Sequence, residues 1–157
     1  MLPDEAATTR AGAALARALP ELRRYSLLLG LSGELGSGKT TLARGLLRAL
    51  GVAGSIRSPT YTLVEPYETA RGTVHHLDLY RLRDGTTELE SLGYRDLRAM
   101  PGLVMVEWPE RAGSALGAPD LQATLTAQDT GRRLVIAPAS GSGSEWLAAV
   151  SRGAVSS

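Results

Sequence analysis

Residues 25–50 read YSLLLGLSGELGSGKTTLARGLLRAL, and this stretch decides the fold class. Its first part, residues 25–31, is a continuous apolar run, which is typical of a strand buried on both faces of a sheet. A glycine-rich loop follows at residues 33–38, and residues 40–50 carry leucines at helical spacing before Gly51, a residue type common just beyond a helix end. The sequence therefore predicts a buried strand, a tight loop and a helix in immediate succession.

The loop matches the pattern G-x-x-x-x-G-K-[ST] at every fixed position. A shuffled chain of the same composition would contain roughly 0.002 such matches, so an ordinary strand–helix connection is the weaker interpretation. In such a loop, successive backbone N–H groups and the helix N-terminus surround a phosphate. We predict a nucleotide site in which the contacts come from Gly33, Gly36, Ser37, Gly38, Lys39, Thr40 and Thr41.

Lys39 is the only lysine among 17 basic residues, because arginine supplies all the others. A lysine retained against this bias is expected where a compact ammonium on a flexible stem is needed and a planar guanidinium would fail. We expect its charge to reach the β- and γ-phosphates, with the Thr40 hydroxyl facing Mg²⁺ and Thr41 donating to the α-phosphate.

Length and composition limit the remaining possibilities. The 157 residues are 43% hydrophobic and 21% charged, which suits one globular domain over residues 1–157. The absence of cysteine excludes disulfides and thiol catalysis. A net charge of +1 gives no sign of a dedicated nucleic-acid binder. No apolar run approaches the ~20 residues of a membrane-spanning helix, and the acidic N-terminus is unlike a signal peptide, so we expect a cytoplasmic protein without membrane contact.

Strand-like and helix-like segments alternate along the rest of the chain. This alternation favours the α/β class: a three-layer fold resembling the nucleoside triphosphatases with this loop, with a mainly parallel sheet, an antiparallel section and helices on both faces. We expect helices over residues 4–19, 88–92 and 94–97, strands over 60–65, 73–79, 103–106, 121–127 and 132–137, and a linker at 140–144 before a short helix from about Glu145.

Two carboxylates are candidates for metal binding and catalysis. Glu107 follows the apolar run LVMV, where a strand buried on both faces ends, and there it would hold Mg²⁺ unless it is simply a surface residue. Asp78 shares one side of its predicted strand with His76 and Tyr80, so it faces either a partner or solvent. The two histidines lack a metal-ligand cluster, and we interpret them as structural or edge residues.

Two further segments have open interpretations. Ser58–Thr62, before the next strand, either provides a hydroxyl that senses the γ-phosphate or forms an ordinary turn. Trp108 is a core residue, a stacking platform or a docking anchor, and the sequence does not decide among these.

Five blocks in order carry a family resemblance: GELGSGKTT, SPTYTLVEPYE, HHLDLYRL, ELESLGYRDL and EWPER. Through them the chain resembles the TsaE (YjeE) family over roughly residues 3–112. The resemblance implies the ATPase component of the bacterial machinery that makes N6-threonylcarbamoyladenosine at position 37 of tRNA. It also implies ATP and Mg²⁺ as ligands, the TsaD–TsaB heterodimer as partner, and contact with tRNA only through that complex.

The resemblance also suggests roles by position. Lys39 and Thr40 hold phosphate and Mg²⁺, Glu107 is the acidic metal partner, Asp78 matches an acid implicated in ATP hydrolysis, and Thr8 matches a threonine near the nucleotide base. The catalytic candidates are thus Lys39, Asp78 and Glu107, and the metal candidates are Thr40 and Glu107. We expect slow turnover without the partner complex.

Two other functions use the same loop. A small-molecule kinase would need an acceptor pocket and a lid, for which Arg111 and residues 112–118 are weak candidates. A nucleotide-gated binding module would use ATP only to order a docking surface. A guanine-specific GTPase is disfavoured because the chain lacks an N/T-K-x-D motif.

Overall fold

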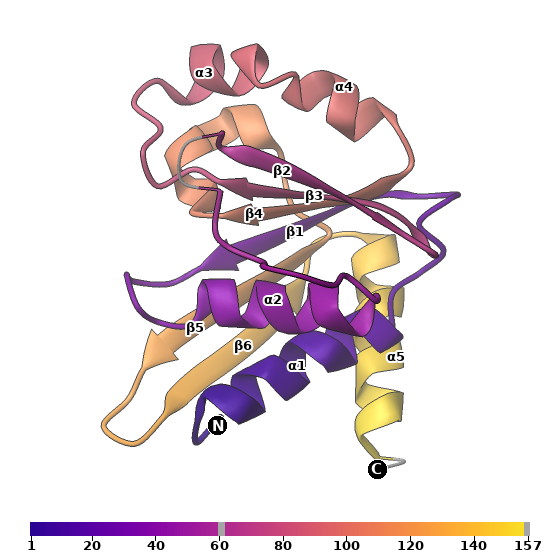
Figure 1. The fold of residues 1–157 in the computed structure, drawn as a ribbon, viewed down its shortest axis with the longest axis vertical. Coiled ribbons are helices and arrows are strands. Elements are labelled where there is room, and N and C mark those ends of the chain that lie inside the picture. The colour runs from indigo at the N-terminus through magenta and orange to yellow at the C-terminus, as the bar shows by residue number, and fades with distance from the viewer. Residues whose placement is uncertain (60–61, 156–157) are drawn as a thin grey trace.

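The computed structural model describes residues 1–59 and 62–155 (Figure 1). In chain order the elements are α1 (Glu5–Arg17), β1 (Ser26–Ser32), α2 (Lys39–Ala49), β2 (Val64–Thr69), β3 (Gly72–Asp78), α3 (Gly85–Ser91), α4 (Tyr94–Ala99), β4 (Gly102–Glu107), the 3₁₀ segment η1 (Pro109–Leu116), β5 (Leu121–Ala127), β6 (Arg132–Pro138) and α5 (Gly141–Val155). The predicted strand, loop and helix at residues 25–50 are therefore confirmed as β1, the glycine-rich loop and α2.

The strands form one sheet in the order β2-β3-β4-β1-β5-β6. Strand β1 lies in the interior and pairs in parallel with β4 and β5, while β3 pairs in parallel with β4. The two edge strands are antiparallel to their neighbours, β2 to β3 and β6 to β5. The predicted mainly parallel sheet with an antiparallel section is confirmed.

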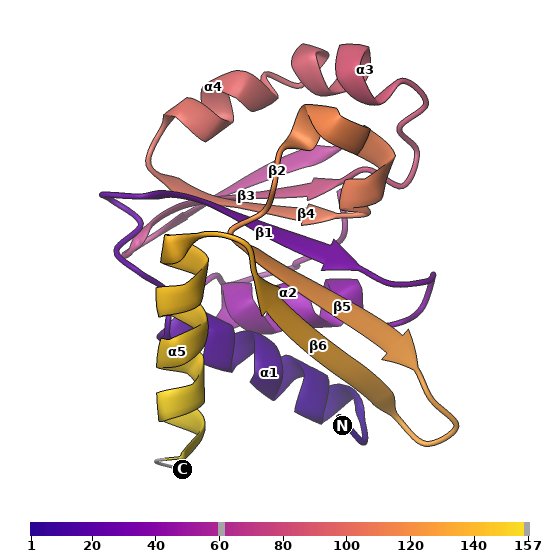
Figure 2. The ribbon, with the colours of Figure 1, turned by 180° about the vertical axis from the view of Figure 1, so that it is seen from behind.

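Helices cover both faces of this sheet, as Figures 1 and 2 show from opposite sides. Leu27, Leu29 and Leu31 of β1 point to the face covered by α1, α2 and α5. Leu28 points to the opposite face, which α3, α4 and η1 cover. This alternation follows from the two-residue period of a strand, and it gives the predicted three layers.

Strand β2 begins later than the sequence predicts. We expected a strand over residues 60–65, but β2 starts at Val64; Thr60 and Tyr61 lie outside the described residues. Leu63 has φ 59°, a left-handed conformation that an extended strand does not contain. Pro66 is tolerated inside β2 because this strand lies at the sheet edge, where a missing N–H costs no ladder bond.

Helix α5 begins at Gly141, so the expected linker at residues 140–144 is instead the start of a helix. Ser140 explains the difference, because its Oγ accepts a hydrogen bond from the Gly143 N–H at 2.9 Å, as an N-cap residue does. Trp146 then buries its ring against α1 and donates from Nε1 to the Leu15 carbonyl at 3.0 Å. Within the described chain no helix has the length and apolar character needed to cross a membrane.

Candidate active site

The glycine-rich loop opens onto a cavity of about 550 Å³ at the carboxyl ends of the parallel strands. Ligands of open α/β sheets bind at this edge because loops from several strands converge there. The lining residues come from the loop, from α1, and from strands and connections on either side of β1. They are Glu5, Leu35, Gly36, Gly38, Lys39, Thr40, Thr41, Ser58, Pro59, Leu63, Asp78, Tyr80, Arg81, Glu107, Trp108 and Arg132.

The loop backbone is shaped for an anion. Gly36 and Gly38 have φ values of 77° and 107°, which residues with a Cβ rarely adopt. Helix α2 has no side-chain cap and no acidic residue in its first turn, so its first N–H groups stay available at the cavity. Gly33 and Ser37, both predicted as ligand contacts, are not among the residues that line the cavity, and Ser37 is buried. A Cβ on Gly33 would lie 2.3 Å from the Leu125 carbonyl oxygen, so this glycine lets β5 approach the loop.

The Lys39 ammonium is held inside the loop. Nζ donates hydrogen bonds to the carbonyl oxygens of Gly33 at 2.6 Å and Glu34 at 2.8 Å, and the side chain is nearly buried. Burial lowers the pKa of Lys39, and the negative charges of Glu107, Glu110 and Asp78 oppose this shift. In the described part of the chain, no carboxylate lies within ion-pair distance of Nζ. The site therefore concentrates positive charge without neutralising it locally, which suits a phosphate.

Glu107 occupies the centre of the site, where the sequence predicted an acid at a strand end. The Thr40 Oγ1 lies 3.0 Å from both carboxylate oxygens, and His76 Nε2 lies 2.8 Å from Oε1. The Glu107 and His76 residues are 2% and 0% exposed. Glu107 is thus a buried carboxylate held by hydrogen-bonding partners and not a surface residue.

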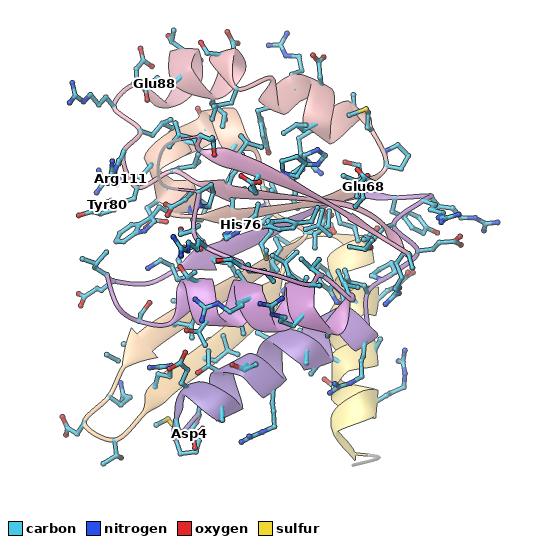
Figure 3. The ribbon with its side chains drawn as sticks, in the orientation of Figure 1. Asp4, Glu68, His76, Tyr80, Glu88 and Arg111 are labelled. Atoms are coloured by element: carbon cyan, nitrogen blue, oxygen red, sulfur yellow. The ribbon has the colours of Figure 1, made fainter. Side chains whose placement is uncertain are left out.

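Of the two interpretations of His76, structural or edge residue, its position excludes the second, because His76 is fully buried beside Glu107. Strands β3 and β4 run parallel, with Asp78 opposite Glu107 in register and His76 two residues before Asp78. All three side chains therefore project from the α2 face of the sheet, and Figure 3 shows His76 in the interior. The sequence signal for this was the two-residue spacing of positions 76 and 78, which places both side chains on the same face of the strand.

Asp78 is fixed by two donors. The Ser58 hydroxyl donates to Oδ2, and the Tyr80 backbone N–H donates to Oδ1 at 3.0 Å. The turn that contains Ser58 and the strand that ends at Asp78 were interpreted independently from the sequence, and in the structure they meet at the Asp78 carboxylate. Both residues line the cavity, so Asp78 faces the site and not bulk solvent alone.

An aromatic wall closes one side of the cavity. Trp108 has φ 59°, an uncommon conformation for a bulky residue that directs its ring next to the loop. Its ring centroid lies 4.2 Å from Lys39 Nζ and 4.9 Å from the Tyr80 ring centroid. The Arg111 guanidinium lies 5.4 and 5.6 Å from the Tyr80 and Trp108 rings, as the grouping of Tyr80 and Arg111 in Figure 3 illustrates. The Trp108 ring therefore packs against Tyr80 and the loop lysine, and it also contacts the core on the α3–α4 face of the sheet.

Thr8 lies behind the opposite side of the cavity. It is fully buried and accepts a hydrogen bond at 3.0 Å from Nη1 of Arg132, which itself lines the cavity. The sequence gave no reason to select Arg132 from 16 arginines. Strand β6 reaches the cavity because it pairs with β5, and this pairing is not visible in the sequence of β6 alone.

The oxygen atoms of Thr40 and Glu107 fit a magnesium ion. Mg²⁺ prefers oxygen ligands and is usually held by one or two protein groups together with water and substrate phosphates. Among the described residues, no group of three His, Cys, Asp or Glu side chains is arranged to hold a metal by itself. The donor set therefore suits an ion that binds with a phosphate ligand.

Comparisons with known proteins agree with this geometry. A family model described as "Threonylcarbamoyl adenosine biosynthesis protein TsaE" matches residues 2–135. The tRNA threonylcarbamoyladenosine biosynthesis protein TsaE of Haemophilus influenzae is 36% identical over 151 residues, which cover 96% of this chain and 95% of that protein. The protein of the same name from Synechocystis is 45% identical over 70% of this chain and 69% of its own. A crystal structure of Bacillus subtilis YdiB has a similar fold, with a TM-score of 0.72 at 24% identity over 96% of this chain and 91% of that chain.

Proposed function

The chain belongs to the TsaE family, and on that premise we propose that it binds and hydrolyses Mg-ATP in support of tRNA threonylcarbamoyladenosine synthesis by a TsaD–TsaB complex. One observation carries the catalytic part of the proposal. The loop lysine and threonine, Lys39 and Thr40, meet two strand-end carboxylates, Asp78 and Glu107, around a single cavity.

The loop provides the phosphate-binding groups. Its N–H groups and the N-terminus of α2 would surround the β-phosphate, because these donors have no other partner in the helix. Lys39 would exchange its bonds to the Gly33 and Glu34 carbonyls for β- and γ-phosphate oxygens. Its buried charge would then stabilise negative charge that develops during phosphoryl transfer.

Thr40 and Glu107 would hold the magnesium ion, which neutralises phosphate charge when bound. His76 supports this role because its ring lies 2.8 Å from Oε1, where an Nε2–H would orient the carboxylate. Glu107 would therefore be committed to the magnesium ion, which leaves the task of orienting the attacking water to the other carboxylate.

Asp78 is suited to that second task. Its donors, Ser58 and the Tyr80 N–H, fix both carboxylate oxygens, and each oxygen retains a further lone pair. A water that donates a hydrogen bond to one of these oxygens would be positioned to attack the γ-phosphorus, and its proton would pass toward Asp78.

The partner complex is expected to complete this site. Leu35 at the loop tip is 75% exposed, and Tyr80 at the cavity rim is 42% exposed, although both are large hydrophobic residues. A docked protein that covers them would exclude water from the phosphates, which strengthens the electrostatic interactions inside. We therefore expect the isolated chain to turn over slowly.

The test is phosphate release by the purified protein, alone and with a reconstituted TsaD–TsaB pair, beside Glu107→Ala. We expect release that the partner stimulates and that Glu107→Ala reduces at least 100-fold, roughly the loss of a catalytic electrostatic contact. Glu145→Ala, an exposed glutamate on α5, is the matched control and should match wild type.

The same assay separates the other two functions. Phosphate release that is absent with partners, together with ATP consumption when a metabolite is added, would indicate a kinase. ATP binding that promotes partner assembly without any turnover would indicate a nucleotide-gated module.

A further inference from the structure

We propose that Arg44 and Arg48, together called the arginine ladder, position Ser58 against the Asp78 carboxylate and so act on the hydrolysis step from outside the cavity. This inference rests on the proposed ATP hydrolysis, in which Asp78 orients the attacking water. Both arginines lie on α2, and neither is among the residues that line the cavity.

The segment between α2 and Ser58 has little backbone support of its own. Residues 51–59 form neither a helix nor a strand. The Gly51 and Val52 N–H groups still donate to α2 carbonyls, but in the part of the chain that the structure describes no backbone–backbone hydrogen bond holds residues 53–59. A segment without such bonds opens easily, so the position of Ser58 depends on side-chain contacts.

The arginine ladder supplies these contacts by donating to backbone carbonyls. Arg48 Nη1 donates to the Val52 carbonyl oxygen at 2.8 Å, and its Nη2 donates to the Gly54 carbonyl oxygen. Arg44 Nε donates to the Ile56 carbonyl oxygen at 3.3 Å. The three accepting residues are alternate positions along the segment.

The spacing of the ladder matches the spacing of its acceptors. Positions 44 and 48 lie one turn apart on α2, which is about 6 Å along the helix axis. Two residues of extended chain span about the same length, roughly 6.6 Å. The segment therefore runs back along α2 toward the N-terminus of the helix. Two residues beyond Ile56, whose side chain is buried in the core, it delivers Ser58 to the cavity that Lys39 and Thr40 line.

Ser58 transmits this placement to the site. Its hydroxyl donates to Asp78 Oδ2, whereas the Tyr80 N–H, from the same turn of chain as the aspartate, donates to Oδ1. Among the described residues, Ser58 is thus the only donor from another segment that holds this carboxylate. A displacement of Ser58 would free Asp78 to rotate, and small misplacements of a reacting group cost much rate. Arg44 and Arg48 are therefore positioning residues.

The first experiment tests the ladder by limited trypsin digestion of the nucleotide-free protein. Arg57 is exposed, so trypsin cleaves after it when the segment opens. We expect Arg44→Ala and Arg48→Ala to raise the rate of cleavage after Arg57 about fivefold, roughly the effect of one lost hydrogen bond. Arg10→Ala, an exposed arginine on α1, is the matched control and should leave this rate unchanged.

The second experiment measures kcat and KM for phosphate release with the partner complex. We expect Ser58→Ala to lower kcat about tenfold and Arg44→Ala about fivefold, with KM unchanged. A ladder that acts through Ser58 has no effect without its hydroxyl, so Arg44→Ala should lower kcat no further in Ser58→Ala. This background also separates the ladder from the exposed 3.8 Å ion pair of Arg44 with Glu5. Arg44→Lys should restore most of the loss, because an ammonium can replace a single donor.

Each outcome decides the proposal. Faster cleavage after Arg57, together with a kcat loss that disappears in the Ser58→Ala background, would support it. Unchanged cleavage, or additive kcat losses in the double variant, would show that the arginines do not position Ser58 and would overturn it. Absence of phosphate release by wild type would refute the proposed function and with it the catalytic effect of the ladder. The cleavage rates need no nucleotide, so they distinguish that failure from failure of the ladder to hold the segment.

Discussion

The two ends of the cavity come from different parts of the fold. Asp78 and Glu107 lie opposite each other on adjacent parallel strands inside the sheet, and Glu107 is held by two hydrogen-bonding partners, Thr40 and His76. Arg132 and Thr8 lie on the edge strand β6 and on α1, and one side-chain hydrogen bond joins them. On the proposed function, the difference suggests a division of labour: the central end would perform the chemistry, which demands fixed geometry, and the peripheral end would provide affinity.

This division makes a kinetic prediction. Changes at the central end should lower kcat with little effect on KM, because their interactions matter most in the transition state. Changes at the peripheral end should raise KM and leave kcat nearly constant. The following variants test the comparison, beginning with the largest expected effect.

Asp78→Asn should lower kcat by roughly 100- to 1,000-fold, the usual contribution of a positioned acid–base group, with KM within a factor of about three. The amide keeps the size of the side chain but is a much weaker proton acceptor. Steady-state phosphate release with the partner complex measures both constants. Asp129→Asn, an exposed aspartate in the β5–β6 turn, should behave as wild type. A tenfold rise in KM for Asp78→Asn with unchanged kcat would reverse the assignment of the two ends.

His76→Leu should raise the Mg²⁺ concentration for half-maximal activity about tenfold, as outer partners of metal ligands commonly do. The variant leaves the buried Glu107 carboxylate without its 2.8 Å neighbour. His76→Gln places an N–H donor near the same position and should restore most of the magnesium affinity. Activity titrated against Mg²⁺ measures the effect, and equal magnesium dependence in all three proteins would show that His76 does not position Glu107.

His75 should affect only stability, and only in mild acid. Burial lowers the pKa of His75 below its ordinary value of 6.5, against the opposing charge of Glu68. As the pH falls, His75 therefore takes up its proton in the unfolded chain before it does so in the folded protein. The stability that neutral His75 contributes is fully present above pH 6.5 and is lost as the pH falls toward and through the folded pKa. His75→Gln should show a smaller drop in melting temperature between pH 7 and pH 5.5 than wild type. If the melting temperature of the variant falls as much as that of wild type, groups other than His75 cause the acid sensitivity.

The sequence predicted the parts of the site that depend on local patterns. The glycine-rich loop and Lys39 follow from a contiguous motif, and Glu107 follows from an apolar run that ends in an acid. These patterns are visible in one segment because loop geometry and strand burial are local properties.

The parts that the sequence did not reveal depend on pairing between distant segments. Arg132 reaches the cavity only because β6 follows β5 across the sheet from β1, and nothing in residues 132–137 alone indicates that neighbour. His76 contacts Glu107 because β3 and β4 pair in a particular register. The late start of β2 depends on the backbone at Leu63, where the residue type favours no left-handed conformation.

The central claim is that the cavity binds ATP through the buried lysine, and calorimetric titration of Mg-ATP into wild type and Lys39→Ala tests it most directly. We predict saturable binding to wild type and none to Lys39→Ala, with both proteins folded. Melting curves provide the control: at 100 times Kd, ATP should stabilise wild type by about 2.7 kcal/mol, a rise in Tm of roughly 5–10 °C, and should not shift the variant. Equal binding of Mg-ATP to both proteins would contradict the account.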